Sequence, residues 1–328
     1  MKTRIKVIAI TFVVLLASAD ALAQSAGVSL KPILKAGQEA RYSLSGSVDT
    51  QITAAGAAGL SGAEHRELSA TLLLRAGVPA PQAASQNATP KAETMVVGSG
   101  LPYSQTTYAV DAGVPSKDVV YYEAVIEAID ARLTVNGVDS PANVKSAVGQ
   151  KIAFALDATG RIVRCAVPME AARAGLADLL FSMLGWAPAA PLNVGQTWGN
   201  LSGNEPLAYG YISAAVMSDV PKSAKTAYTF SALEDNHAVV EGTISLRQEG
   251  ATMLQIPAVQ AKVNLMASGS GTTRIEYDVA TNRIASAVSE SLVKGRIVNI
   301  PPTREGEKMQ MREGALVETA KFSIKLTP

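Results

Sequence analysis

Apolar and polar residues alternate along most of this chain, which is typical of β-strands with one buried face. The longest run begins at Val120 and reaches Asn136-Gly137, a pair that tolerates positive φ and favours a hairpin. The alternating segments are 42–48, 68–74, 120–135, 153–156, 161–165, 209–217, 226–233, 238–246, 261–268, 273–277, 283–292 and 317–326. The sequence therefore predicts a mainly β, β-rich α+β protein with curved antiparallel sheets.

One segment, 168–185, has helical spacing instead of alternation. Its apolar side chains share one face, and Pro168 and Gly185 suit the first turn and the residue after the last turn. We expect one amphipathic helix that covers the open face of a sheet, within a helix-and-linker segment of residues 168–188. The alternatives are a membrane-touching helix and a lid over an apolar ligand, whose candidate residues are Leu176, Leu179, Leu180, Met183, Trp186 and Trp198.

Two short signatures recur in the same order, which predicts an internal duplication. The segment 34–38 is echoed at 192–196, each with a Gly-Gln pair, and the turn in 154–162 is echoed in 275–284. The predicted organisation is a first β half at 24–167, with a flexible polar insertion at 76–118, and a second β half at 189–328.

These signatures also carry a resemblance to known proteins. Gly37-Gln38 and Gly195-Gln196 before strands, with an Asp-x-x-Gly-Arg hairpin at 157–161, resemble uncharacterised secreted bacterial β proteins of domain-of-unknown-function families. More loosely, the chain is similar to periplasmic lipoprotein carriers, in which helices close a curved antiparallel sheet around an apolar cavity. The resemblance implies a fold and assigns no catalytic residue.

The first 23 residues have the features of a cleavable signal peptide. Lys2, Arg4 and Lys6 precede an apolar run at 8–16 that is too short to span a bilayer, and Ala21 and Ala23 fit the cleavage pattern. We expect cleavage before Gln24, a periplasmic or secreted protein, and no stable membrane insertion afterwards.

Charge and composition exclude several partners. Residues 1–23 hold three of the 29 basic and one of the 28 acidic residues, so the mature chain has 26 and 27, without a basic cluster that would bind nucleic acid. Cys165 is the only cysteine, so no internal disulfide is expected, and its strand phase predicts a buried, unreactive thiol.

The sequence contains no motif that dictates a reaction. His65 and His237 are the only histidines, are predicted in exposed loops, and are too few for a histidine-rich metal site. Glu123 and Glu127 are predicted to face solvent, opposite Tyr122. A nucleophile elbow and a phosphate-binding loop are both missing. We expect no catalytic residue, cofactor or metal.

The predicted function is therefore an exported, non-enzymatic cell-envelope protein that binds an apolar small molecule or another envelope protein. A purely structural or assembly role in the envelope is the close alternative. An outer-membrane β-barrel and a hydrolase are further alternatives, disfavoured by the missing aromatic girdles and by the missing catalytic motif.

Overall fold

The computed structural model describes residues 27–31, 34–55, 61–78, 94–97, 101–104, 119–141, 144–157, 162–166, 176, 180, 186–188, 190–199, 222–256, 259–299 and 312–328. Twelve strands form one antiparallel sheet of order β8-β7-β5-β2-β1-β14-β13-β12-β11-β10-β9, with β6 beside β5. Their bounds are β1 Glu39–Ala55, β2 Gly62–Ala76, β5 Val119–Val135, β6 Val138–Pro141, β7 Lys151–Asp157, β8 Ile162–Ala166, β9 Thr197–Trp198, β10 Lys222–Glu234, β11 His237–Ile256, β12 Val259–Asp278, β13 Arg283–Asn299 and β14 Arg312–Thr327.

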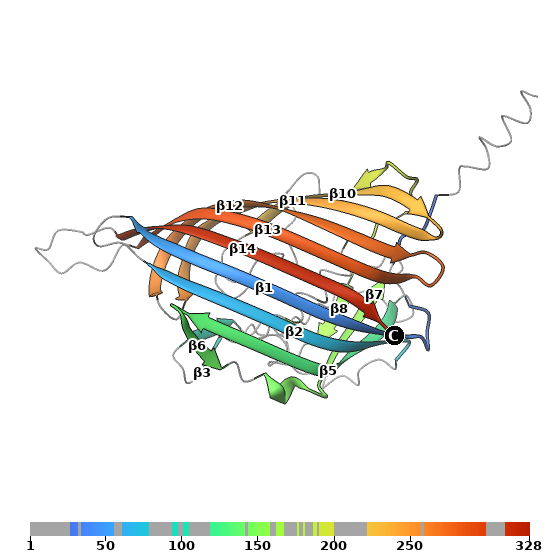
Figure 1. Ribbon diagram of the computed structural model, residues 1–328, viewed down its shortest axis with the longest axis horizontal. Helices are drawn as coiled ribbons and strands as arrows, with labels where there is room; N and C mark the ends of the chain where they lie inside the picture. Colours follow the sequence, from blue (N-terminus) through green and yellow to red (C-terminus); the bar gives the residue numbers. More distant parts are fainter. Residues whose placement is uncertain are drawn as a thin grey trace, which may run out of the picture.

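The sheet is strongly curved. Figure 1 shows a trough in which β10, β11 and β12 form one side, β14 and β1 the middle, and β2 and β5 the other side. β11 and β2 come into contact although four strands separate them in the sheet order. The concave face thus packs partly on itself, and the fold buries its apolar side by curling.

The mainly β prediction is confirmed, but the β-rich α+β class with an amphipathic helix is wrong. Within the described ranges the only named helical element is a short 3₁₀ turn, Lys145–Ala147, and two isolated residues are also helical. Of the predicted helix, the structure describes Leu176 and Leu180, which have helical backbone conformation and are fully buried; the rest of 168–185 lies outside the described residues.

The two predicted halves contribute strands to a single sheet, and their internal duplication stays a prediction. β1 and β14, from opposite ends of the sequence, pair from Arg41↔Thr327 to Ala55↔Glu313, so both predicted halves share one continuous sheet. The Gly-Gln repeat is a shared local turn: Gln38 Oε1 accepts from Lys35 N at 2.9 Å, and Gln196 Oε1 accepts from Asn193 N at 2.7 Å. The same type of turn therefore precedes β1 and β9, which belong to one sheet.

Of the remaining sequence predictions, one turn is confirmed and several segments lie outside the described residues. Asn136-Gly137 does form the hairpin turn between β5 and β6, with φ of 49° and 80°. The strand predicted at 209–217 and most of the insertion 76–118 lie outside the described residues, apart from the hairpin of β3 Thr94–Val97 and β4 Leu101–Ser104. Cys165 lies in β8, but its side chain is outside the described set.

A β-bulge in β5 reverses the phase of burial. Ile126 pairs with Leu72 whereas Ala128 pairs with Thr71, so Glu127 is an extra residue. Buried positions therefore change from even to odd, and Ile129 is buried while Ala128 is exposed. The uninterrupted alternation predicted through Ala128 is wrong for this reason.

Glycines on β12 permit the close approach of β13. A Cβ on Gly269 would lie 2.6 Å from Leu292 O, and one on Gly271 would lie 2.8 Å from Glu290 O. Both contacts are shorter than real Cβ atoms tolerate, so a side chain here would push the strands apart. The Gly269-Ser270-Gly271 sequence is therefore a device for curvature.

Candidate functional site

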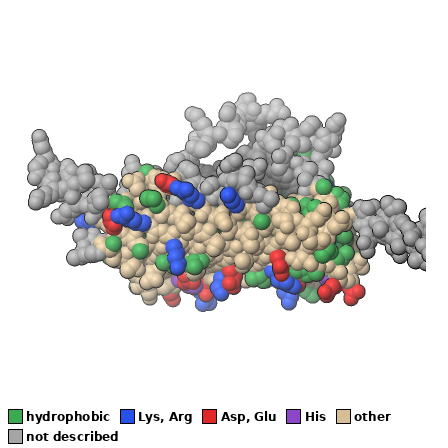
Figure 2. Space-filling model, turned by 90° about the horizontal axis from the view of Figure 1, so that it is seen from above, with side chains coloured by type: hydrophobic (Ala, Val, Ile, Leu, Met, Phe, Trp, Pro, Cys, Tyr) green, Lys and Arg blue, Asp and Glu red, His purple; other side chains and the backbone are tan. Residues whose placement is uncertain are grey.

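The two faces of the sheet differ sharply in polarity. Along β1 the even-numbered residues Tyr42, Leu44 and Ile52 are buried, while Ser43 and Gln51 between them are exposed. On the side of the molecule that Figure 2 shows, backbone and uncharged polar side chains predominate, with scattered lysine, arginine, aspartate and glutamate and several hydrophobic side chains. The concave face is therefore where an apolar molecule could be held.

The buried side chains of the concave face form two groups. The first is a core cluster that unites strand residues with all the buried apolar residues outside strands, including Leu30, Leu34, Leu176, Leu180 and Trp186. The second, which we name the apolar field, consists only of strand residues: Ile52, Ile244, Leu246, Val263, Leu265, Ala267, Val293, Ile297, Leu316 and Ala320.

The predicted ligand or lid residues fall in the first group. Leu176 and Leu180 are 0% exposed and Trp186 is 1% exposed, so they are packed as core residues. Trp198 is half-buried against the same cluster. Leu179 and Met183 lie outside the described residues. The structure thus brings the described candidates together in a packed core.

Four aromatic rings organise this part of the core. The ring centres of Trp186 and Tyr277 are 5.9 Å apart with an edge-on geometry, and those of Trp198 and Tyr228 are 5.7 Å apart and stacked. The indole Nε1 of Trp198 donates to Trp186 O at 2.6 Å. These contacts hold β9 and β10 against the centre of the cluster.

Two buried carboxylates lie beside the apolar field. Thr50 on β1 stands opposite Glu64 on β2 and Glu318 on β14, and all three are at most 4% exposed. Thr50 Oγ1 donates to Glu318 Oε2 at 3.2 Å, and Arg66 forms an ion pair with Glu64 Oε1. The concave face therefore carries a buried polar row among apolar side chains, and Thr226 and Thr273 are further buried polar residues on it.

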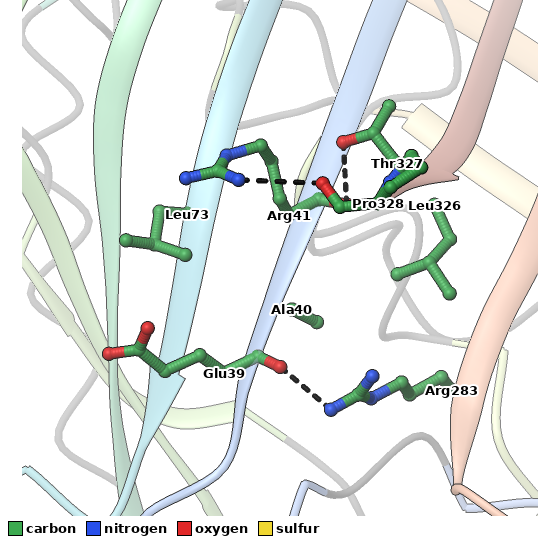
Figure 3. Close-up of a pocket in the computed structure, with 8 residues that line it drawn as sticks. All are labelled: Glu39, Ala40, Arg41, Leu73, Arg283, Leu326, Thr327 and Pro328. Atoms are coloured by element: carbon green, nitrogen blue, oxygen red, sulfur yellow. Dashed lines mark hydrogen bonds between the residues drawn. The ribbon is translucent and has the colours of Figure 1, made fainter.

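A groove of about 480 Å³ opens at the rim of the sheet, where β1 begins and β14 ends. Figure 3 shows its lining residues Glu39, Ala40, Arg41, Leu73, Arg283, Leu326, Thr327 and Pro328. Arg283 Nη2 donates to Glu39 O at 2.7 Å, and Arg41 Nη1 donates to Pro328 O at 3.4 Å. Sequence reasoning missed this groove because its residues are distant in the chain and meet only through strand register.

Electrostatics in and around the groove are mostly balanced. Arg41 forms a two-point ion pair with Glu127, at 2.7 and 3.0 Å, which raises the pKa of Arg41 and lowers the pKa of Glu127. Burial raises the pKa of Tyr42 to about 12, opposed by the positive charge of Arg283.

The two histidines lie in strands, so their assignment to loops is wrong. His65 belongs to β2 and His237 is the first residue of β11. His65 Nδ1 is 2.6 Å from Asp49 Oδ1 and its Nε2 is 3.2 Å from Glu67 Oε1, and the hydrogen bond with Asp49 is the main cause of a raised His65 pKa. Each ring nitrogen of His65 contacts one carboxylate, so both N–H donors of the protonated ring have an acceptor.

The acidic residues on β5 have structural partners. Glu123 and Glu127 do face away from the buried Tyr122, as predicted. Glu123 pairs with Lys151 at 2.9 Å. In the part of the chain that the structure describes, no group of three histidine, cysteine, aspartate or glutamate residues is arranged to hold a metal ion. Across the same residues, no helix has the length and apolar character needed to cross a bilayer.

Comparisons with known proteins give a distant likeness. Protein-family models and curated sequences give no match. Among solved structures, lipovitellin, from work on its lipid–protein interactions, aligns with a TM-score of 0.47 and 10% identity over 90% of this chain and 26% of its own. An outer membrane channel from Pseudomonas putida F1 aligns at 0.20 and 8% identity, over 90% and 97%. The chain spans about a quarter of the lipovitellin chain, and both TM-scores are below 0.5, so neither likeness indicates a ligand.

Proposed function

We propose that this protein is an exported, non-enzymatic protein of the bacterial cell envelope that holds an apolar molecule on the concave face of its curled sheet. The observation that carries the proposal is the apolar field. Leu265 lies opposite Ile297, and Ile52 lies opposite Leu316, so the field continues across neighbouring strands. It lies outside the core cluster, all its members are strand residues, and each is at most 6% exposed. An apolar guest would therefore replace the contacts that bury these side chains in the unliganded chain.

The chemistry of this face favours binding over catalysis. An apolar guest gains about 25 cal/mol for each Å² of apolar surface that it buries, without any directional contact. Glu64 and Glu318 are the buried charged residues of the described chain, and Arg66 and Thr50 respectively contact them. The polar row is thus a place for the polar end of a guest.

A purely structural role is the second candidate, because the predicted lid residues Leu176, Leu180 and Trp186 are packed as core. The two roles differ in what the purified protein carries. A binding protein purified without detergent yields apolar molecules on organic extraction, and the stripped protein binds Nile red. A structural protein does neither.

A matched pair of substitutions locates the site. Ala267 faces the apolar field and Ser268 is the next residue, exposed on the convex face. Ala267→Phe adds a bulky ring to the buried apolar field itself and is expected to weaken Nile red binding at least tenfold, whereas Ser268→Phe leaves it unchanged. Circular dichroism must show that both variants are folded. An empty extract together with a wild-type protein that fails to bind Nile red would refute the proposal.

A further inference from the structure

The groove lies at the rim where β13 and β14 are no longer paired, at the first residues of β13 and the last residues of β14. β14 pairs with β1 as far as Thr327, but it pairs with β13 only from Lys325↔Ser286 onward. Ala285 is an extra residue in β13, since Glu276 pairs with Ser286 and Tyr277 with Ile284. This bulge separates the first residues of β13 from the last residues of β14.

The groove combines an apolar floor with a charged wall. The apolar part comes from Leu73, on the convex side of β2, and from Ala40 and Leu326, which belong to or pack against the core cluster where β1 begins and β14 ends. Arg283 stands on the other side, and its side chain reaches the start of β1 (Figure 3). The groove has a volume of about 480 Å³ and is open to solvent, so it would contact one side of a ligand.

Arg283 is the one arginine of this groove that forms no ion pair within the described residues. Asp278 lies directly opposite it on β12, but the Asp278 carboxylate accepts from Ala280 N, Thr281 N and Thr281 Oγ1. Glu39 Oε1 is 2.8 Å from Arg75 Nε, and the Glu39 carboxylate points away from Arg283 in Figure 3. Arg41 is paired with Glu127. Arg283 donates only to the main-chain oxygen of Glu39, and its buried Nε has no acceptor. A guanidinium in this state favours a carboxylate or phosphate ligand.

We propose that the groove binds an anionic amphiphile, with its carboxylate or phosphate group on Arg283 and its aliphatic chain on Ala40, Leu73 and Leu326. The groove is separate from the apolar field, so this inference stands or falls independently of the function proposed above. Neither free inorganic phosphate nor a cationic amphiphile meets both requirements.

Calorimetric titration of the full mature chain tests the proposal with four probes, each below its micellar concentration: decyl phosphate, decanoate, inorganic phosphate and decyltrimethylammonium. We expect the first two to bind and the last two to bind at least tenfold more weakly. Inorganic phosphate binding as tightly as decyl phosphate would show that the apolar floor plays no part. Tight binding of decyltrimethylammonium would show that the positive charge of Arg283 plays no part in binding. Either result overturns the proposal.

Substitutions then assign the site to its residues. Arg283→Gln is expected to weaken decyl phosphate binding about tenfold to hundredfold, the effect of losing a charged hydrogen-bond donor. Arg274→Gln is the matched control, because Arg274 is exposed, outside the groove, and paired with Glu241 at 3.4 Å. If Arg283→Gln does not fold, Leu73→Glu places a repelling carboxylate on the floor without touching Arg283. Unchanged affinity in a folded Arg283→Gln or Leu73→Glu variant overturns the proposal.

Discussion

Replacing two adjacent leucines tests the one-sidedness of the sheet most directly. Leu72 is 0% exposed on the concave face, opposite Tyr42 on β1 and Ile126 on β5. Leu73 is half-buried on the convex side. The substitution to alanine is chemically identical at both positions, so any difference in the free energy of unfolding reports the environment alone.

The expected magnitudes follow from burial. Leu72→Ala loses roughly 2.4 kcal/mol of transfer free energy, at about 0.8 kcal/mol per buried carbon, and the cavity raises the loss to about 3–4 kcal/mol. Leu73→Ala leaves no closed cavity and loses about 1 kcal/mol, because its side chain is already partly in water.

Urea unfolding followed by tryptophan fluorescence measures both variants. Trp186 is a member of the core cluster and Trp198 packs against it, so their emission reports loss of that cluster. We expect a large decrease in the midpoint for Leu72→Ala and a small one for Leu73→Ala, with the same slope. Equal decreases, or a larger one for Leu73→Ala, would refute the assignment of concave and convex faces.

Three further predictions concern other parts of the chain. The pKa of His65 is raised in the folded state, so its pairing with Asp49 stabilises the fold fully below the unfolded-state pKa of about 6.5. This stabilisation is lost as the pH rises through the folded-state pKa. Asp49→Asn should therefore lower the urea midpoint at pH 5.5 and not at pH 9, and a loss independent of pH would contradict this. Gly271→Val should lower stability by at least about 2 kcal/mol because its Cβ meets the β13 backbone, whereas Ser270→Val on the exposed face changes it by about 0.5 kcal/mol or less. Mass spectrometry of exported protein should find Gln24 at the N-terminus, and retention of residues 8–16 would disprove cleavage.

Alternation in the sequence predicts most of the strands because burial of one face imposes a two-residue period. Segments such as 42–48 and 238–246 lie inside β1 and β11, which are longer than the predicted runs. A predicted run ends too early where a small residue takes the place of an apolar one on the concave face. Gly269 and Gly271 divide β12 into two apparent strands, although the backbone continues through both.

Strand order and bulges could not be predicted from the sequence. The pairing of β1 with β14 joins residues that are more than 250 positions apart, and no local pattern encodes it. Glu127 and Ala285 are ordinary residues, and each becomes the extra residue of a bulge only when its partner strand is in place. The two buried carboxylates were missed for the same reason, since Glu64 and Glu318 meet on either side of Thr50 only through register.

The two bulges also explain why the rim carries the charge that it does. In β5 the extra residue is Glu127, and its carboxylate reaches Arg41 across β2, which neutralises one arginine of the groove. In β13 the extra residue is Ala285, which lies just before the point where pairing with β14 begins, and Arg283 on its other side donates to Glu39 O at the start of β1. The bulge in β5 thus supplies the acidic partner of Arg41, and the bulge in β13 lies beside the groove. An arginine that forms no ion pair in the described chain, beside apolar side chains, is thus found where pairing departs from regularity, and no motif in the sequence marks it.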